Sequence, residues 1–213
     1  MAEKTVPVSV YAEMTPNPAV LKFVANKRLL EEDSVEFKNI EEAQPSPLAS
    51  RLFHFPFVKQ VFISANYVAI TKYEIVDWED VTLEMRELIR DFLAEGQPVL
   101  QANPPQEKDE SKVADAVQST NPVQAHPDEK PSEEWDAIDQ KIAELLDEYV
   151  QPAVAADGGK IKFLNHQEGT VSVLLQGACS GCPSSTMTLK QGIERMLQDM
   201  MPGQIKAVEA VNG

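Results

Sequence analysis

A stretch of 32 residues without large apolar side chains divides this chain of 213 residues. From Gln101 to Ser132 there is no Leu, Ile, Met or aromatic residue, whereas prolines recur among charged and small side chains. Such a segment cannot bury enough apolar surface to offset the entropy lost on ordering. We therefore predict a disordered, proline-rich linker over residues 101–132, between a first domain (1–100) and a second domain (133–213). The alternative is a long ordered loop, which compact domains seldom contain.

The first domain combines strand and helix patterns. Residues 61–64 and 67–71 are predicted to form a hairpin, with Val61 opposite Ile70 and Ile63 opposite Val68. A helix is predicted over residues 78–93, capped by Asp77. Four apolar side chains are expected to form its buried stripe: Leu83, Leu88, Ile89 and Phe92.

The second domain has a cleaner pattern. One long helix is predicted from a Ser132 cap to Tyr149, ended by Gln151-Pro152. Two antiparallel strands, a helix and a last strand should follow, over residues 160–164, 170–175, from 183 onward and 205–211. The order α-β-β-α-β gives a small sheet with helices on one side. The fold class of the chain is thus α+β, with two small α/β-layer domains.

Composition and charge argue against several functional classes. A net charge of −15 opposes nucleic-acid binding, because phosphate contacts need basic surface. No apolar run approaches the roughly 18 residues of a membrane span, so no membrane partner is expected. The N-terminus, Met1 to Thr5, lacks an apolar signal core and an Arg-rich transit pattern, and we expect a cytoplasmic protein. With no acid–base pair, phosphate loop or nucleophile–base arrangement, we expect no enzymatic activity.

The chemistry of the chain is concentrated in its only two cysteines, Cys179 and Cys182. Glycines flank the pair, and glycine adopts backbone angles that let two thiolates converge on one point. That arrangement suits a metal or a redox pair. Two thiolates cannot complete a tetrahedral thiolate site, so a metal site needs two more ligands. A second copy of the chain is the natural source.

The loop also offers hydrogen-bond donors. Cys182 precedes the helix expected from Pro183, where backbone N–H groups and the helix dipole lower the pKa of a thiol. Ser180 and Gly181 can donate hydrogen bonds to sulfur, and with Gly177 they form the part of the loop expected to contact a bound group. The sulfur atoms should be partly exposed, because release of a metal cargo requires thiol exchange.

Four interpretations of the cysteine pair remain. The first is an iron–sulfur cluster shared between two chains, and the second is a dithiol/disulfide redox protein. The third is zinc held between two chains, and the fourth is two buried cysteines that act as small hydrophobic residues. A cluster carrier is brown when purified without air and loses its colour to chelators, whereas a redox protein is colourless and reduces disulfides. The glycine-rich loop and the helix start argue against the fourth interpretation, and a thioredoxin-like redox protein needs a longer βαβ context than this domain provides. The shared cluster fits best, and zinc held between two chains stays open.

Residues 133–213 resemble the C-terminal domain of the NifU/Nfu family of iron–sulfur cluster assembly proteins. Three runs carry the resemblance: PAVAADGG (152–159), LQGACSGCPSST (175–186) and TLKQGIE (188–194). The first domain resembles the Nfu N-terminal domain through TPNPA (15–19), LKF (21–23), SPLA (46–49), VAITK (68–72) and DW (77–78). Full-length NifU adds a cysteine-bearing scaffold domain and a ferredoxin-like domain, and neither can be present in a chain with two cysteines.

The resemblance implies that Cys179 and Cys182 ligate an iron–sulfur cluster, usually [4Fe–4S], with [2Fe–2S] left open. The cluster would be held between two protomers of a homodimer and delivered to apo-proteins. The implied partners are apo iron–sulfur client proteins and upstream cluster assembly factors, and the implied role is that of a carrier. The motif also implies that Asp157-Gly158-Gly159 packs near the cysteines. The first domain has no cysteine, so it should engage clients or restrain the second domain.

Overall fold

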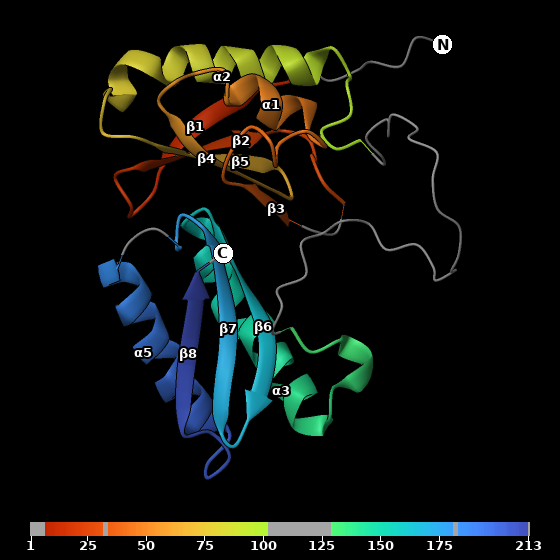
Figure 1. Cartoon of the computed structure of the whole chain (residues 1–213), viewed down its shortest axis with the longest axis vertical. Helices are drawn as coiled ribbons and strands as arrows, with labels where there is room; N and C mark the ends of the chain where they lie inside the picture. Colours follow the sequence, from red (N-terminus) through yellow and green to blue (C-terminus); the bar gives the residue numbers. More distant parts are fainter. Residues whose placement is uncertain (1–6, 32–33, 102–128, 181–182, 213) are drawn as a thin grey trace, which may run out of the picture.

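The computed structural model of the chain describes residues 7–31, 34–101, 129–180 and 183–212. Two small α/β domains are present in these ranges, one with a five-stranded sheet and one with a three-stranded sheet (Figure 1). This confirms the predicted fold class. Residues 102–128, which make up most of the predicted linker, lie outside the described residues.

The first domain is built on an antiparallel sheet with the strand order β1-β2-β5-β4-β3. Its strands are β1 (Val10–Met14), β2 (Val20–Ala25), β3 (Ser34–Phe37), β4 (Val58–Ser64) and β5 (Tyr67–Lys72). Two helices, α1 (Pro47–Leu52) and α2 (Trp78–Ala94), cover one face of this sheet, and the second domain lies on the other face (Figure 1).

Side chains alternate between the two faces of the five-stranded sheet, as the strand period of two residues requires. Phe23, Ile63 and Ile70 point toward the helices and belong to the main core of the first domain. Their strand neighbours point to the opposite face and form a second apolar cluster: Val20, Val24, Phe62, Tyr67 and Ala69. The sheet is therefore buried on both faces.

The predicted hairpin is confirmed, with Val61 paired with Ile70 and Ile63 with Val68. The predicted stripe of α2 is wrong at Leu83, which is 57% exposed. The helix packs on the sheet through the face that carries Val81, Met85 and Ile89. Leu83 is two positions from Val81 and therefore points away from that face. Asp77 precedes the helix, but its side chain makes no capping hydrogen bond.

The second domain contains an antiparallel hairpin and one further strand that is parallel to the second strand of the hairpin. Its sheet has the order β6-β7-β8, with β6 antiparallel and β8 parallel to β7. Apolar side chains of the helices share one core with Val171, Val173 and Leu175, which are alternate residues of β7. The strands and the last helix are β6 (Gly159–Gln167), β7 (Thr170–Gly177), α5 (Pro183–Met200) and β8 (Ala207–Asn212). No helix in the described ranges is long and apolar enough to cross a membrane.

The single long helix predicted at the start of the second domain is instead a series of shorter helical segments. They are η1 (Ser132–Glu134), α3 (Ala137–Leu145), the π-helical η2 (Leu146–Val150) and α4 (Gln151–Ala156). Asp136, and not Ser132, caps α3, because its carboxylate accepts hydrogen bonds from the N–H groups of Ile138 and Asp139. Pro152 does not end the helix, since a proline is tolerated in the first turn of α4.

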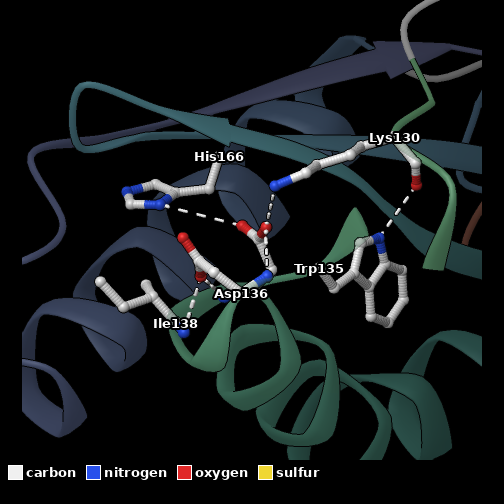
Figure 2. Close-up of polar contacts among 6 residues, drawn as sticks. Lys130, Trp135, Asp136, Ile138 and His166 are labelled. Carbon is white, nitrogen blue, oxygen red and sulfur yellow. Dashed lines mark hydrogen bonds and ion pairs between the residues drawn. The ribbon is translucent and has the colours of Figure 1, made fainter. Parts of the chain in front are cut away.

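Residues just before η1 also contact the second domain (Figure 2). Lys130 Nζ lies 2.6 Å from Oδ2 of Asp139, a residue that is only 1% exposed. The backbone N–H of Lys130 donates to the carbonyl of Leu164 in β6, and Trp135 Nε1 donates to the carbonyl of Lys130. His166 Nδ1 lies 4.0 Å from Asp139 Oδ1. The contacts of the second domain thus begin before residue 133.

Candidate metal site at the cysteine loop

The cysteine loop, residues 178–182, joins the end of β7 to the start of α5. Gly177 precedes it with φ +68°, and a Cβ there would lie 2.6 Å from the carbonyl oxygen of Gly158. The N–H of Ala178 donates to the same carbonyl at 3.2 Å. The implied packing of Asp157-Gly158-Gly159 near the cysteines is therefore confirmed by the contacts of Gly158.

Cys179 is buried, with 8% of its surface exposed, and it is part of the core of the second domain. The absence of a side chain at Gly159 makes room for it, since a Cβ on Gly159 would lie 2.9 Å from Cys179 Sγ. Burial, and then the negative charge of Asp157, raise the pKa of Cys179 to about 11. At neutral pH the side chain is thus a thiol. The expectation of a partly exposed sulfur is wrong for Cys179 in this structure.

The other predicted residues of the loop are only partly described. Cys182 and Gly181 lie outside the described residues. Ser180 donates from both its N–H and its hydroxyl to the carbonyl of Gly177, at 3.1 and 2.9 Å. Thr186 Oγ1, in α5, donates to the carbonyl of Cys179 at 3.0 Å. These bonds hold the backbone on both sides of the Cys179 side chain.

An open groove of about 870 Å³ runs between α5 and β8 next to the loop. Its lining includes Ser180, Thr186, Met187, Lys190 and Glu209. Within the described ranges, no group of three or more His, Cys, Asp or Glu side chains converges as a metal site.

The first domain contacts the segments next to Cys179 with four polar side chains. Glu36 Oε1 accepts a hydrogen bond from the N–H of Gly177 at 2.7 Å, and Asn17 Nδ2 donates to the carbonyl of Ala178 at 3.3 Å. Tyr67 Oη donates to the carbonyl of Gly159 at 3.0 Å. Lys22 Nζ donates to the last two carbonyls of α4, those of Ala155 and Ala156, at 3.2 and 3.3 Å. The cysteine loop is therefore bordered by residues of both domains.

Sequence reasoning missed these four residues. The Thr15-Pro16-Asn17-Pro18 stretch forms a turn that is closed by internal hydrogen bonds. Asn17 nevertheless also reaches the loop. The signal that could have revealed this surface is the run Tyr67-Val68-Ala69-Ile70, since strands buried on both faces are apolar at consecutive positions. All four of these residues are at most 4% exposed.

Comparison with known proteins adds to this geometry. Residues 10–96 match the family described as scaffold protein Nfu/NifU N terminal, and residues 142–209 match the NifU-like domain. The human protein named NFU1 iron-sulfur cluster scaffold homolog, mitochondrial, is 35% identical over 203 residues, which are 95% of this chain and 71% of that protein. The chain belongs to the Nfu/NifU family.

Two further relatives have similar identities to this Nfu/NifU chain. A protein of the same name from Drosophila sechellia is 36% identical over 95% of the chain, and NifU-like protein 4, mitochondrial, from Arabidopsis thaliana is 35% identical over 94%. The chain spans 64% of the length of the first and 65% of the second. The names of these relatives contradict the expected cytoplasmic location, because all three are named mitochondrial. The N-terminal sequence pattern therefore did not predict the location correctly.

Proposed function

We propose that this Nfu/NifU chain is an iron–sulfur cluster carrier. Two protomers would bind one [4Fe–4S] cluster through Cys179 and Cys182 of each, and the dimer would transfer it to apo-proteins. The observation that carries the proposal is the position of the cysteines. The only two in the chain lie within residues 142–209, which match the NifU-like domain. The names of the relatives, iron-sulfur cluster scaffold homologs, support the same function.

The sharing of the cluster follows from the number of thiolates. A [4Fe–4S] cluster is held by four cysteine thiolates, and one chain supplies two. Two copies related by a twofold axis would present the same pair to one point, which makes the site symmetric. In this proposal the cluster is a cargo and not a permanent cofactor, so its ligands must be able to leave it.

The buried thiol of Cys179 sets the conditions for loading. A cysteine ligates metal as the thiolate, so binding releases its proton and requires direct access to sulfur. Cys179 does not offer that access in the structure described above, because it is buried. Loading therefore requires the cysteine loop to change conformation and turn Sγ outward. The groove between α5 and β8 leaves one side of the loop open for that movement.

Anaerobic reconstitution with iron and sulfide tests the proposal. The parent chain should gain the broad visible absorption of a cluster and then activate an apo-enzyme that depends on [4Fe–4S]. Cys179→Ser and Cys182→Ser should each lose stable binding, because one substitution removes two ligands from a symmetric site. Cys179→Ala keeps an apolar side chain at the buried position and controls for folding. A serine variant that held the cluster as firmly as the parent would refute the assigned ligand.

The two alternatives give different results in the same experiment. A dithiol redox protein would stay colourless and reduce the disulfides of insulin, and the serine variants would lose that reaction. A dimeric zinc protein would stay colourless and retain zinc on metal analysis. Either outcome, in place of a cluster, would replace the proposed function.

A further inference from the structure

The second face of the five-stranded sheet carries an apolar surface that its own domain does not cover. Phe62, Tyr67 and Ala69 are at most 4% exposed, although they point away from the core under α1 and α2. The residue of the other domain that completes their cluster is Ala178, next to Cys179. Figure 1 shows the end of β7 and the turn before β6 lying against this face.

Four polar side chains around this apolar surface bind backbone atoms of the second domain. The side chains of Asn17, Lys22, Glu36 and Tyr67 bind the N–H of Gly177 and the carbonyls of Ala155, Ala156, Gly159 and Ala178. These atoms belong to the two segments that flank the Cys179 side chain. A glycine allows the close approach at position 177, where a Cβ would lie 2.9 Å from the Phe62 ring.

Two of these bonds bear directly on the conformation of the cysteine loop. Glu36 holds the N–H of Gly177 and Asn17 holds the carbonyl of Ala178, the two residues before Cys179. Tyr67 holds the carbonyl of Gly159, the residue that makes room for Cys179 Sγ. A rotation of this backbone that turns the Cys179 side chain outward would break bonds to the first domain.

We propose that the second face of the sheet, with Lys22, Glu36, Phe62, Tyr67 and Ala69, is a docking surface for the two segments of the same chain that flank Cys179, residues 155–159 and 177–178. When docked, it keeps Cys179 in the core of the second domain. The occupant is set by the structure, because these two segments of the same chain lie on the face and their backbone groups satisfy its buried polar side chains.

A consequence for loading rests on the proposed function. The docked state withholds one of the two thiolates that each protomer would supply, so release of the loop from the first domain must precede cluster binding. Docking to this surface therefore slows the loading of the cluster. Because docking and a shared cluster are alternative states, docking also lowers the apparent affinity for the cluster, while the content reached at saturating iron and sulfide stays the same.

Thiol labelling without metal tests the docking surface. In a Cys182→Ser background Cys179 is the only thiol of the full chain, and its reaction with N-ethylmaleimide can be followed by mass spectrometry. The test variant combines Lys22→Met with Tyr67→Phe, which keep side-chain size but remove three hydrogen bonds to the second domain. Labelling should become at least about tenfold faster, as expected when three hydrogen bonds of ordinary net strength are lost. Tyr67→Phe alone, an isosteric change, should give a smaller increase.

A matched control makes equivalent changes away from the surface. Lys27 Nζ donates to the carbonyl of Leu93 inside the first domain, and Tyr11 is exposed on β1. Lys27→Met with Tyr11→Phe should leave the labelling rate at the parent value. Small-angle scattering should show a larger radius of gyration for the test variant than for the parent. The control should have the same radius of gyration as the parent. Circular dichroism of each protein establishes that the domains remain folded.

The outcomes separate the docking surface from the proposed function. A test variant labelled at the parent rate would overturn the docking surface. Protection that grows with protein concentration would also overturn it, because the occupant would then be the loop of a second copy. With both cysteines present, the test variant should load the cluster faster than the parent, and to the same final content at saturating iron and sulfide. If neither protein loads a cluster, the proposed function fails, while the labelling result still decides the docking surface.

Discussion

Glu36 and Gly177 are 141 positions apart in the chain, yet Glu36 Oε1 accepts a hydrogen bond from the N–H of Gly177 at 2.7 Å. Glu36 is 6% exposed, and burial raises the pKa of its carboxyl group. A carboxyl group buried in this way needs a hydrogen-bond partner, and Gly177 provides one from the other domain. The pair therefore connects the Nfu N-terminal domain to the strand that leads into the cysteines.

Hydrogen exchange can measure this connection at a single amide. Glu36→Ala removes the acceptor of the Gly177 N–H, so exchange at Gly177 should become about tenfold faster or more. The neighbouring amide of Ala178 is an internal control, because its acceptor is the carbonyl of Gly158 in the same domain. Equal acceleration at both amides would indicate general loosening of the loop. No change at Gly177 would show that the two domains are apart in solution.

Two glycines of the second domain should respond oppositely to substitution by alanine. A Cβ at Gly159 would lie 2.8 Å from the carbonyl oxygen of Gln176 and 2.9 Å from Cys179 Sγ. Gly159→Ala should therefore lower the free energy of unfolding by about 1–3 kcal/mol. Gly192 lies in α5 with no atom near the added Cβ, and Gly192→Ala should raise the same quantity by up to about 1 kcal/mol. Urea unfolding of both variants checks the signs, and a Gly159→Ala variant as stable as the parent would contradict the packing around Cys179.

The contact between Lys130 and Asp139 should stabilise the second domain. Lys130→Met leaves the nearly inaccessible Asp139 carboxylate without its cation, and the free energy of unfolding should fall. Lys141→Met is the matched control, since Lys141 pairs with Glu144 on the exposed surface and such pairs contribute little. A fragment that starts at residue 129 should for the same reason be more stable than one that starts at 133. Equal stability of the two fragments would remove the role given to Lys130.

Parts of this architecture could be predicted from the sequence because they depend on local patterns. The pairing of Val61 with Ile70 follows from alternation within two adjacent strands. The buried face of α2 was harder, because its apolar residues occur on more than one side and only the sheet selects Val81 and Met85 over Leu83.

The cysteine site was predictable only in part. The spacing and the family motif placed Gly158 beside the loop, and its bond with Ala178 agrees. The inward position of Cys179 could not be predicted, because it depends on the missing side chain of Gly159 and on contacts between distant segments. The role of Tyr67 was equally hidden, since its partner is a backbone carbonyl that has no sequence signature.

Removal of the first domain should separate recognition from cluster binding. The first domain has a core of its own, and the helices and sheet of the second domain form another. Residues 129–213 alone should therefore hold a cluster, while delivery to some client enzymes should slow, because a tethered domain raises the effective concentration of cargo near a bound client. Transfer is to be timed at equal cluster loading for several apo-enzymes. Identical rates for full-length and shortened protein would leave the first domain without a targeting role.

The central claim, a cluster shared between two chains, is tested most directly by mass. After anaerobic reconstitution, native mass spectrometry is combined with iron and sulfide analysis of the same sample. The account predicts that loading converts monomer into a species of two 23.6 kDa chains with one [4Fe–4S] cluster, and that a chelator returns it to monomer. A loaded species with the mass of one chain, and with no added small-molecule thiol, would contradict it.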